Sequence, residues 1–381
     1  MKNKPIKIVH LISSLKIGGA EMLLIHLINE LAKSGYQQEV MYFHDGPMRH
    51  ELSLNNQSVH QIKGFFFRYD PIFFYRLISA LRRSRPSVIH ASLWAASFFG
   101  RCIAWLFSMP IICAVHAQPA HGGQFRLWCD WITARFAQQV VAVSPSIATS
   151  LVKNRLARCE HITVIQNGID SSAFAQRAFN ERKERTQFDF DQSHFLIGAV
   201  GRLVPVKNYP LLFKAVALLL PDYPQVRLLM VGSGPEEQKL RAMAHQLGIS
   251  PYVCFVSGTQ LAYGYYSLFD CFVQPSFTEG LSMALLEAMS SSLACVVSAI
   301  DQHPVIKNSR NGLIIRPDDV QSLMGAVSRL INDHELRLAL AKQAYEDAAK
   351  KFSLKKTCKS YQSIFKLNSK RAHFTQILKN S

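Results

Sequence analysis

The chain has 381 residues, of which 49% are apolar and 18% are charged, and its formal net charge is +17. This composition excludes an intrinsically disordered chain. The chain is longer than a domain that is built around one hydrophobic core usually is, so two domains are expected. The eight cysteines are scattered without C-x-x-C spacing, which argues against a zinc finger and favours free thiols in a reducing compartment.

Short, apolar, β-rich runs alternate with amphipathic stretches along the first half of the chain. We predict strands at 6–12, 38–43, 88–91, 111–115, 140–143 and 162–165. Such alternation is typical of a parallel sheet that is covered by helices on both faces. The first half is therefore predicted to form one α/β domain over residues 1–175.

The most apolar window, 93–115, is nearly long enough to cross a membrane. Arg101 in its middle and Pro110 near its end argue against a membrane-spanning helix. We instead predict a buried helix followed by a buried strand. The first residues lack the long apolar region and cleavage site of a secretory signal, so the protein is expected to be cytoplasmic.

From residue 170 to 193 the sequence turns polar and charged, which predicts a linker, placed at 176–192. The alternation then restarts, with strands predicted at 195–200, 227–231, 253–256, 271–273 and 294–297. Helical patterns close the chain, the first beginning near residue 319. A second α/β domain is therefore placed at 193–352. The two domains are expected to be Rossmann-like, with doubly wound parallel sheets, and to face each other across a cleft.

The stretch 269–297 reads as strand, loop, helix and strand, and it carries two glutamates eight positions apart. Glu279 lies on the loop before the helix, and Glu287 lies about two turns along it. Free N–H groups at a helix N-terminus attract phosphates, and carboxylates accept hydrogen bonds from sugar hydroxyls. A nucleotide-sugar offers both kinds of group. The alternative is an ordinary glutamate on a solvated helix face.

This stretch resembles the EX7E signature of the family 4 retaining glycosyltransferases, and three further segments match the same family in the expected order. Residues 7–21 resemble its first strand and glycine-rich loop, 201–208 its basic loop, and 311–319 the segment after the second glutamate's strand. The resemblance covers about residues 6–350. It implies the GT-B fold, in which the last segment, here 353–381, crosses back to the first domain.

The resemblance also implies roles for residues at the ends of predicted strands. His116 would line the sugar pocket, and Gly18 and Gly19 would lie over the donor diphosphate. Arg202 and Lys207 would stabilise the leaving nucleoside diphosphate, and two such cations can replace a metal ion. Taken without the resemblance, the histidine is an ordinary polar residue, the glycines form a tight turn and the two cations lie on the surface.

The same resemblance assigns the two ends of the donor to the two glutamates. Glu279 would meet the transferred sugar, and Glu287 would accept hydrogen bonds from the ribose hydroxyls. Gly280, Leu281 and Ser282, at the predicted helix N-terminus, complete the predicted donor site. Neither a metal site nor a cofactor is predicted, because the donor, linked to UDP or GDP, is itself a substrate.

The chain departs from the family pattern at 299–306. After the strand 294–297 the family usually carries a pair of glycines and then Pro-Glu, whereas this chain has Asp-Gln-His-Pro-Val at 301–305. The Gly and Pro that usually precede that strand are Ser292 and Ala294. Contacts from 299–306 are therefore not included in the predicted site.

Rival motifs are weaker. Gly232 and Gly234 could begin a dinucleotide-binding loop, but Glu237 stands where the third glycine belongs. Asp189 and Asp191 superficially resemble a metal-binding pair, but they lie in the charged linker and are expected to be solvated. These motifs therefore add no cofactor or metal to the predicted site.

The net charge of +17 raises the question of whether the protein binds an anionic partner, such as nucleic acid or a membrane surface. Nucleic acid is not expected, because the basic residues are dispersed and no nucleic-acid-binding module is present. Residues 63–85 mix aromatic and basic side chains, which suits an anionic membrane surface. The alternative is that these aromatics pack inward while the arginines face water.

Together these observations predict a metal-independent, retaining hexosyltransferase that extends a cell-envelope glycan. That glycan would be lipopolysaccharide, O-antigen, capsule or exopolysaccharide, with the acceptor on a lipid. The enzyme would be peripheral on the inner face of the plasma membrane. Two alternatives stay open, a nucleotide-sugar epimerase of similar two-domain fold and a sugar-nucleotide binding protein without activity.

Overall fold

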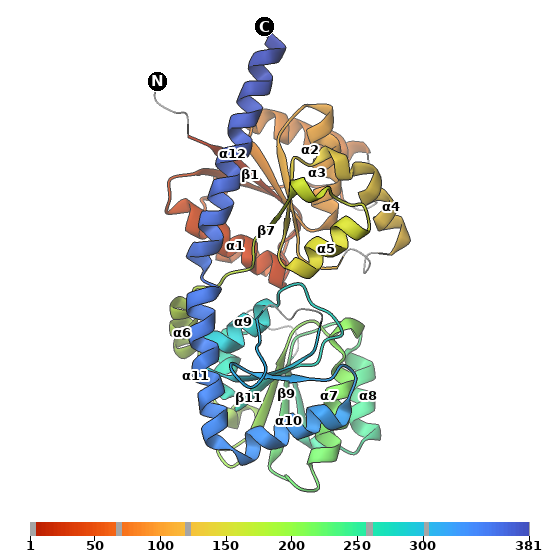
Figure 1. Ribbon diagram of the computed structural model, residues 1–381, viewed down its shortest axis with the longest axis vertical. Helices are drawn as coiled ribbons and strands as arrows, with labels where there is room; N and C mark the ends of the chain where they lie inside the picture. The colour runs from red at the N-terminus through yellow and green to blue at the C-terminus, as the bar shows by residue number, and fades with distance from the viewer. Residues whose placement is uncertain (1–4, 66–70, 119–122, 257–261, 301–304, 381) are drawn as a thin grey trace. The chain divides into compact units, whose positions relative to one another are not determined.

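The computed structural model describes residues 5–65, 71–118, 123–256, 262–300 and 305–380 (Figure 1). The chain divides into two compact units. Unit 1 comprises Met1–Gly168 and Leu354–Ser381, and unit 2 comprises Ile169–Ser353. Each unit is an α/β structure built on its own parallel sheet, as the alternating pattern predicts.

Within the described residues, unit 1 contains a seven-stranded parallel sheet with the order β3-β2-β1-β4-β5-β6-β7. Its strands are β1 (Lys7–Ser14), β2 (Gln37–His44), β3 (Val59–Gln61), β4 (Val88–Ser92), β5 (Ile111–Val115), β6 (Gln139–Ala142) and β7 (Ile162–Val164). Its helices are α1 (Gly19–Ala32), α2 (Pro71–Ser84), α3 (Trp94–Leu106), α4 (Gln124–Thr133), α5 (Pro145–Lys153) and α12 (Leu354–Asn380). The sequence did not predict β3, because only Val59 of its three residues is buried.

Helices α1 and α12 cover one face of this sheet, and α2 to α5 lie on the other side (Figure 1). The last helix is part of the unit 1 core, where Tyr361 and Phe365 pack with sheet residues such as Ile8 and Val88. Both aromatic side chains are almost fully buried. Residues from the end of the chain therefore complete a domain that the first residues begin.

A buried chain of polar side chains lies under α12. The amide of Gln38 donates from Nε2 to the Ile28 carbonyl, so its Oε1 accepts from His10 Nε2, 3.0 Å away. The other nitrogen of a neutral His10 is then an acceptor, and His90 Nδ1 donates to it at 3.1 Å. Burial lowers the pKa of His10 to about 4, against the opposing hydrogen bond with Gln38, and lowers the pKa of His90 well below its usual value.

This pair predicts acid destabilisation of the fold. Between about pH 6.5 and 4, His10 is protonated in the unfolded chain and neutral in the folded one, so stability falls as the pH falls through that window. The shift in pKa corresponds to about 3 kcal/mol for His10. Thermal unfolding between pH 7 and 5 should show a smaller decrease in a His10→Leu/His90→Leu variant than in the wild type. The exposed His334→Gln serves as the control, and equal slopes in all three proteins would refute this account.

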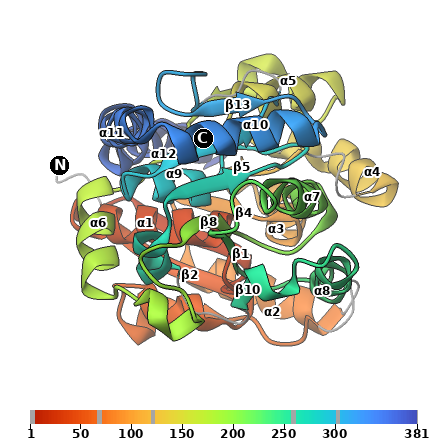
Figure 2. The ribbon, with the colours of Figure 1, turned by 90° about the horizontal axis from the view of Figure 1, so that it is seen from below.

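Within the described residues, unit 2 contains a six-stranded parallel sheet with the order β10-β9-β8-β11-β12-β13. Its strands are β8 (Phe195–Val200), β9 (Val226–Val231), β10 (Val253–Val256), β11 (Cys271–Gln274), β12 (Ala294–Ser298) and β13 (Leu313–Ile315). Its helices are α6 (Ser171–Asn180), α7 (Tyr209–Leu219), α8 (Glu237–Gln246), α9 (Met283–Ser290), α10 (Val320–Asn332) and α11 (His334–Lys351). Helices α7, α8 and α10 lie on one side of this sheet, and α6, α9 and α11 lie on the other (Figure 2).

The segment 176–192, predicted to be a linker, includes the end of helix α6 and lies within unit 2. Helix α6 runs into this segment, and its Phe174 is buried against the rings of Tyr263 and Tyr266. Arg185, part of the charged run, donates from Nη2 to the Leu268 carbonyl at 2.7 Å and to Asp270 Oδ2 at 2.8 Å. The charges that suggested a solvated linker therefore tie the segment to unit 2. Asp189 and Asp191 are exposed, as expected.

The apolar window 93–115 forms a helix and a strand, as predicted, namely α3 and β5. Arg101 is buried on α3 and forms an ion pair with Asp130 of α4. A buried cation with a partner of opposite charge is compatible with a protein interior. Among the described residues, no helix is both long enough and apolar enough to span a membrane.

The aromatic and basic region 63–85 is divided between core and surface. Phe73 is fully buried, and Phe65 contacts the rings of Phe43, Phe73 and Phe99, so these two aromatics pack inward. Arg82, like Arg83 and Arg85, is exposed. Residues 66–70 lie outside the described residues. The inward packing removes Phe65 and Phe73 from any membrane-facing surface.

Candidate active site

The predicted unit 2 residues lie where two neighbouring strands end. Strands β8 and β11 are hydrogen-bonded neighbours in the sheet. The loop after β8 carries Arg202 and Lys207, and the loop after β11 carries Glu279. Because parallel strands end at the same edge of a sheet, two segments that are far apart in the sequence meet there. This is the edge at which ligands of such sheets bind.

Lys207 and Glu279 are in direct contact. The Lys207 Nζ atom lies 2.6 Å from Glu279 Oε1, which also accepts a hydrogen bond from Ser276 Oγ at 2.7 Å. The two charged side chains are 15% and 16% exposed, so the pair is partly shielded yet reachable from solvent. The cation that the sequence predicts for the donor diphosphate and the carboxylate that it predicts for the transferred sugar therefore belong to one cluster.

Backbone contacts fix the loop that presents Lys207. A short 3-10 turn, Pro205–Lys207, precedes Asn208, whose φ of 50° places it in the left-handed region that asparagine tolerates. The Phe277 N–H donates to the Val206 carbonyl at 2.9 Å and joins this loop to the loop of Glu279. The position of Lys207 is thus set by the neighbouring strand's loop.

Glycines allow the strand-end loops to pack closely. Gly232, at the end of β9, has a φ of 148°, and a Cβ atom there would lie 2.0 Å from the Gly201 carbonyl oxygen. A Cβ atom on Gly234 would lie 2.3 Å from the Leu203 carbonyl oxygen. The Gly232–Gly234 pair, rejected as a dinucleotide motif, therefore has a structural role beside the loop of Arg202.

Helix α9 begins directly after the Glu279 loop. Ser282 is its N-cap, and Ser282 Oγ accepts from the Leu285 N–H at 3.3 Å and donates to Gln274 Oε1 at 2.7 Å. Gly280 and Leu281 are buried. Gln274 at the end of β11 thus holds the capping side chain of Ser282. The start of the helix, with its partial positive charge, is therefore fixed beside Glu279.

Glu287 lies within α9, as predicted, and is buried. Its Oε2 accepts a hydrogen bond from the Tyr266 hydroxyl at 2.7 Å. Burial raises the pKa of Glu287 above that of an ordinary carboxyl group, and the hydrogen bond from Tyr266 opposes this rise. A carboxylate held in this way is oriented before any ligand arrives.

Arg202 and Tyr209 lie before and after Lys207 in the chain. Arg202 is exposed on the loop after β8. Tyr209 is buried, and a Cβ atom on Gly201 would lie 3.0 Å from its hydroxyl and 3.7 Å from Lys207 Nζ. Burial raises the pKa of Tyr209, and the nearby charge of Glu279 raises it further, so the hydroxyl stays protonated as a donor.

The predicted glycine loop belongs to unit 1. Gly18 is the N-cap of α1, which begins at Gly19, and the Gly18 carbonyl accepts from the Met22 N–H at 2.9 Å. The Gly18 φ of −173° is open to any residue, and the nearest atoms to a Cβ there belong to the end of the Glu21 side chain. A Cβ atom there would lie 2.4 Å from Glu21 Oε2, and the same carboxylate accepts from Ser14 Oγ at 3.0 Å.

His116 follows β5 in unit 1, at the carboxyl end of the strand. Both ring nitrogens are shielded from solvent and have no hydrogen-bond partner among the described residues. Burial lowers the pKa of His116 to about 4, so the ring is neutral at pH 7. A neutral imidazole with unused polar atoms can exchange hydrogen bonds with a ligand hydroxyl.

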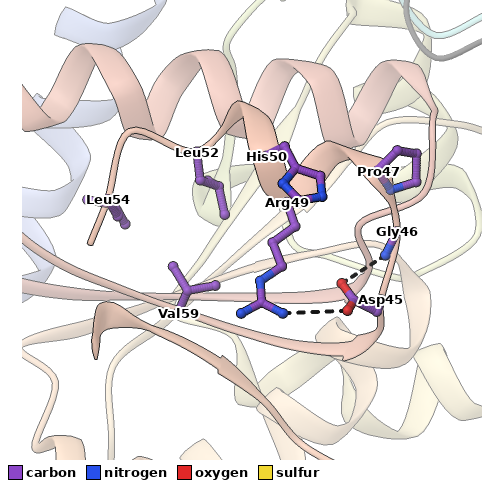
Figure 3. Close-up of a pocket in the computed structure, with 8 residues that line it drawn as sticks. All are labelled: Asp45, Gly46, Pro47, Arg49, His50, Leu52, Leu54 and Val59. Carbon is purple, nitrogen blue, oxygen red and sulfur yellow. Dashed lines mark hydrogen bonds and ion pairs between the residues drawn. The ribbon is translucent and has the colours of Figure 1, made fainter. Parts of the chain in front are cut away.

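A pocket of about 700 Å³ opens after β2 in unit 1 (Figure 3). Its walls combine a carboxylate, a guanidinium and an imidazole with apolar side chains, and they comprise Asp45, Gly46, Pro47, Arg49, His50, Leu52, Leu54 and Val59. Asp45 lies 3.6 Å from Arg49 and accepts from the Gly46 N–H at 2.9 Å. Gly46 packs on the loop after β1, since a Cβ atom there would lie 2.3 Å from the Leu15 carbonyl oxygen.

Sequence reasoning missed three supporting residues of unit 2. Ser276 holds Glu279, Gln274 holds the N-cap Ser282, and Tyr266 holds Glu287. Only Ser276 carried a signal, because it lies three residues before Glu279 on a predicted strand-end loop. Nothing local indicates that Tyr266, 21 residues away, would reach Glu287.

The remaining matched segment, 311–319, is structural. Asn311 is fully buried, donates to Asp347 Oδ2 at 2.8 Å and accepts from the Lys307 N–H at 2.7 Å. Asp319 caps α10 by accepting from the Ser322 N–H at 2.9 Å. Residues 301–304, where the chain departs from the family pattern, lie outside the described residues. In the described parts of the chain, no group of three His, Cys, Asp or Glu side chains is placed to hold a metal ion.

Both halves of the sequence match known family models. Residues 17–173 match the family model described as Glycosyltransferase Family 4, and residues 180–347 match that of Glycosyl transferases group 1. The sulfoquinovosyl transferase of Arabidopsis thaliana is 27% identical over 72% of this chain, but the match spans only 56% of that protein. The lipopolysaccharide core biosynthesis glycosyltransferase LpsE of Rhizobium meliloti is 26% identical over 92% of this chain and 96% of its own.

A solved structure shows the same fold. The Anabaena protein HepE, crystallised in complex with UDP and glucose, has a TM-score of 0.85 and 23% identity, covering 95% of this chain and 99% of its own. The two parallel-sheet α/β units thus match the GT-B glycosyltransferases. With both family models matched in succession and the two glutamates of the signature placed on and before α9, the chain belongs to the family 4 glycosyltransferases.

Proposed function

We propose that the protein is a retaining hexosyltransferase that moves a sugar from a UDP-hexose to a growing cell-envelope glycan. The observation that carries this proposal is the Lys207–Glu279 pair beside the N-terminus of α9. One cluster thereby offers a cation and helix N–H groups to a diphosphate, and a carboxylate to sugar hydroxyls.

The leaving group determines what the cations do. When the bond between the anomeric carbon and the diphosphate oxygen breaks, the diphosphate keeps the electron pair. Lys207 and Arg202 stabilise that charge, and the N-terminus of α9 adds to their field. The acceptor hydroxyl forms the new bond to the anomeric carbon, and its proton passes to the departing diphosphate oxygen. Because two side-chain cations perform the task of a metal ion, we infer that the reaction is metal-independent.

Glu287 is proposed to hold the ribose. Its side chain is buried and oriented by Tyr266, so its orientation is set before the nucleotide arrives. A carboxylate that accepts from a pair of vicinal hydroxyls makes charge-assisted hydrogen bonds. Uridine is chosen over guanosine as the base because the similar HepE structure contains UDP.

The acceptor is proposed to bind unit 1. The pocket beside β2 offers Asp45, Arg49 and His50 at a strand end, which suits the hydroxyls of a glycan. A cell-envelope glycan is proposed because the relative LpsE is named for lipopolysaccharide core biosynthesis. His116 and the Gly18–Gly19 loop remain predicted donor contacts from the same unit. The sugar chain would be built on a lipid at the cytoplasmic side of the membrane.

Incubation with UDP-glucose and other UDP-hexoses tests this function. A transferase releases UDP slowly by hydrolysis of the donor, whereas an epimerase yields a new UDP-sugar and a binding protein yields neither.

EDTA should leave the rate of UDP release nearly unchanged, and a strict requirement for Mg²⁺ or Mn²⁺ would contradict the role given to the cations. If UDP at 100 times its dissociation constant bound only the folded protein, stability would rise by about 2.7 kcal/mol. No shift in the melting temperature with UDP, GDP or their sugars would overturn the donor assignment.

A further inference from the structure

Large apolar side chains are exposed together on α3 and α4 of unit 1. Trp105 is 63% exposed and Leu106 is 54% exposed at the end of α3, while Trp128 and Trp131 on α4 are 59% and 56% exposed. Phe125, at the start of α4, is 42% exposed. Single exposed apolar residues are ordinary, but a contiguous cluster that includes three tryptophans marks an interaction surface.

An apolar groove lies within this cluster. It has a volume of about 340 Å³ and is lined by Phe74, Phe98, Cys102, Trp105, Leu106, Trp128, Cys129, Ile132, Thr133 and Phe136. Its walls come from α2, α3 and α4 and the turn after α4. No charged side chain is among these residues, so the groove suits hydrocarbon.

Two arginines lie over aromatic rings beside the groove. The Arg135 guanidinium lies 5.6 Å from the centroid of Phe136, which stacks on Trp105 with centroids 4.9 Å apart. At the end of α3, the Arg82 guanidinium lies 5.2 Å from the centroid of Phe107. These contacts hold cationic groups beside the exposed apolar side chains.

A third arginine reaches the same surface from α4. The Arg126 guanidinium lies 4.9 Å from the centroid of Trp94, which stacks on the groove residue Phe98. In the sequence from 71 to 138 there are seven arginines and a single acidic residue, Asp130. That carboxylate is engaged by Arg101. Arg101 is itself buried, so the cations beside the groove are Arg82, Arg126 and Arg135, and the surface is both apolar and positive.

We propose that this face, defined by Trp105, Leu106, Phe125, Trp128 and Trp131 with its bordering arginines, docks the protein on an anionic lipid bilayer. Tryptophan combines an apolar ring with a polar N–H and is favoured at the membrane interface, while arginine binds anionic headgroups. The groove between the helices accepts a hydrocarbon chain of the lipid. The face replaces the inward-packed aromatics of 63–85 as the lipid-contacting surface.

Charge complementarity favours lipid over a second copy of the chain. A symmetric dimer through this face would place the same arginines opposite one another, with one acidic residue that is already paired. An anionic bilayer instead neutralises all of them. The biological use of the docking rests on the proposed lipid-linked acceptor, but the docking itself is measured without donor or acceptor.

Tryptophan fluorescence of the full-length protein tests the proposal directly, because three of the four tryptophans lie on the face. Vesicles of phosphatidylglycerol mixed with phosphatidylcholine should shift the emission to shorter wavelength, and brominated lipids should quench it. Pure phosphatidylcholine vesicles should bind much more weakly. Equal binding to both compositions, or no spectral change at low salt, would overturn the proposal.

Two variants separate the apolar and the cationic parts of the face. Trp105→Ser/Trp128→Ser/Trp131→Ser should abolish sedimentation with anionic vesicles. In Arg82→Gln/Arg126→Gln/Arg135→Gln, each lost cation should weaken binding about fivefold, or about 100-fold together, and salt should affect this variant less. Vesicle binding that both variants retain would refute the assignment of this face.

Matched controls lie on unit 2. Phe179→Ser/Leu338→Ser removes exposed apolar side chains, and Lys214→Gln/Lys239→Gln/Lys342→Gln removes three positive charges, so both should bind vesicles like the wild type. All variants should still release UDP from UDP-glucose in solution, and loss of that reaction would implicate folding or the proposed function. A wild-type dimer that the tryptophan substitutions dissociate, without vesicle binding, would assign the face to a second copy and overturn the proposal.

Discussion

The Lys207→Ala variant is expected to release UDP from UDP-glucose about 100- to 1000-fold more slowly than the wild type, which is the usual effect of losing one preorganised electrostatic group. Lys207 is presented by a loop that a backbone hydrogen bond ties to the loop of Glu279, and its ammonium group is held by the Glu279 carboxylate. The loss should fall on kcat more than on KM, because charge on the diphosphate increases as the bond breaks.

Controls separate charge from stability. Lys214→Ala removes an exposed lysine from α7 and should keep wild-type turnover. Lys207→Arg keeps the cation and should retain more activity than Lys207→Ala. Thermal unfolding should show that Lys207→Ala stays folded, although Glu279 loses its ion-pair partner, because the hydrogen bond from Ser276 remains. Near-wild-type turnover in folded Lys207→Ala would remove this residue from the site.

Replacing Glu287 by alanine should weaken the binding of free UDP by about 10- to 100-fold. The estimate follows from the loss of hydrogen bonds to a charged acceptor, worth about 1.5–3 kcal/mol. Calorimetric titration of UDP into the purified variant measures the effect. The fold should tolerate the change, because the Tyr266 hydroxyl also contacts the Ala284 carbonyl at 3.3 Å.

Two companion variants test whether the loss of UDP affinity is specific to Glu287. Glu279→Ala should leave UDP affinity nearly unchanged and lower turnover of UDP-glucose, since Glu279 is assigned to the sugar. Tyr266→Phe should weaken UDP binding less than Glu287→Ala, because it removes only the group that orients the carboxylate. Equal losses of UDP affinity in Glu279→Ala and Glu287→Ala would show that the assignment of the two donor ends is wrong.

Much of the fold and of the site could be read from local patterns. Buried parallel strands are short apolar runs whatever surrounds them, so β1, β8 and β11 were recognisable without any contact information. The place of Glu279 before a helix and of Glu287 within it follows from the same local periodicity. Sequence therefore determined the two α/β units and the order of the candidate site residues.

Pairing between distant segments was decided only by the tertiary structure. Lys207 and Glu279 are 72 residues apart, and they meet because β8 and β11 are neighbours in a sheet whose strand order the sequence does not state. Arg185 looked like part of a solvated linker until the Leu268 carbonyl and Asp270 gave it partners. A charge is costly to bury only when it is unpaired, and its partners are not encoded nearby.

The same reasoning explains the aromatic residues. Phe73 on α2 and Trp105 on α3 are both large apolar residues on helices, yet the first is fully buried and the second is 63% exposed. Apolar periodicity identifies the face of a helix that avoids water, but core and lipid satisfy that preference equally. Which aromatics face outward depends on how α2, α3 and α4 pack on the sheet, and this packing is set by the whole of unit 1.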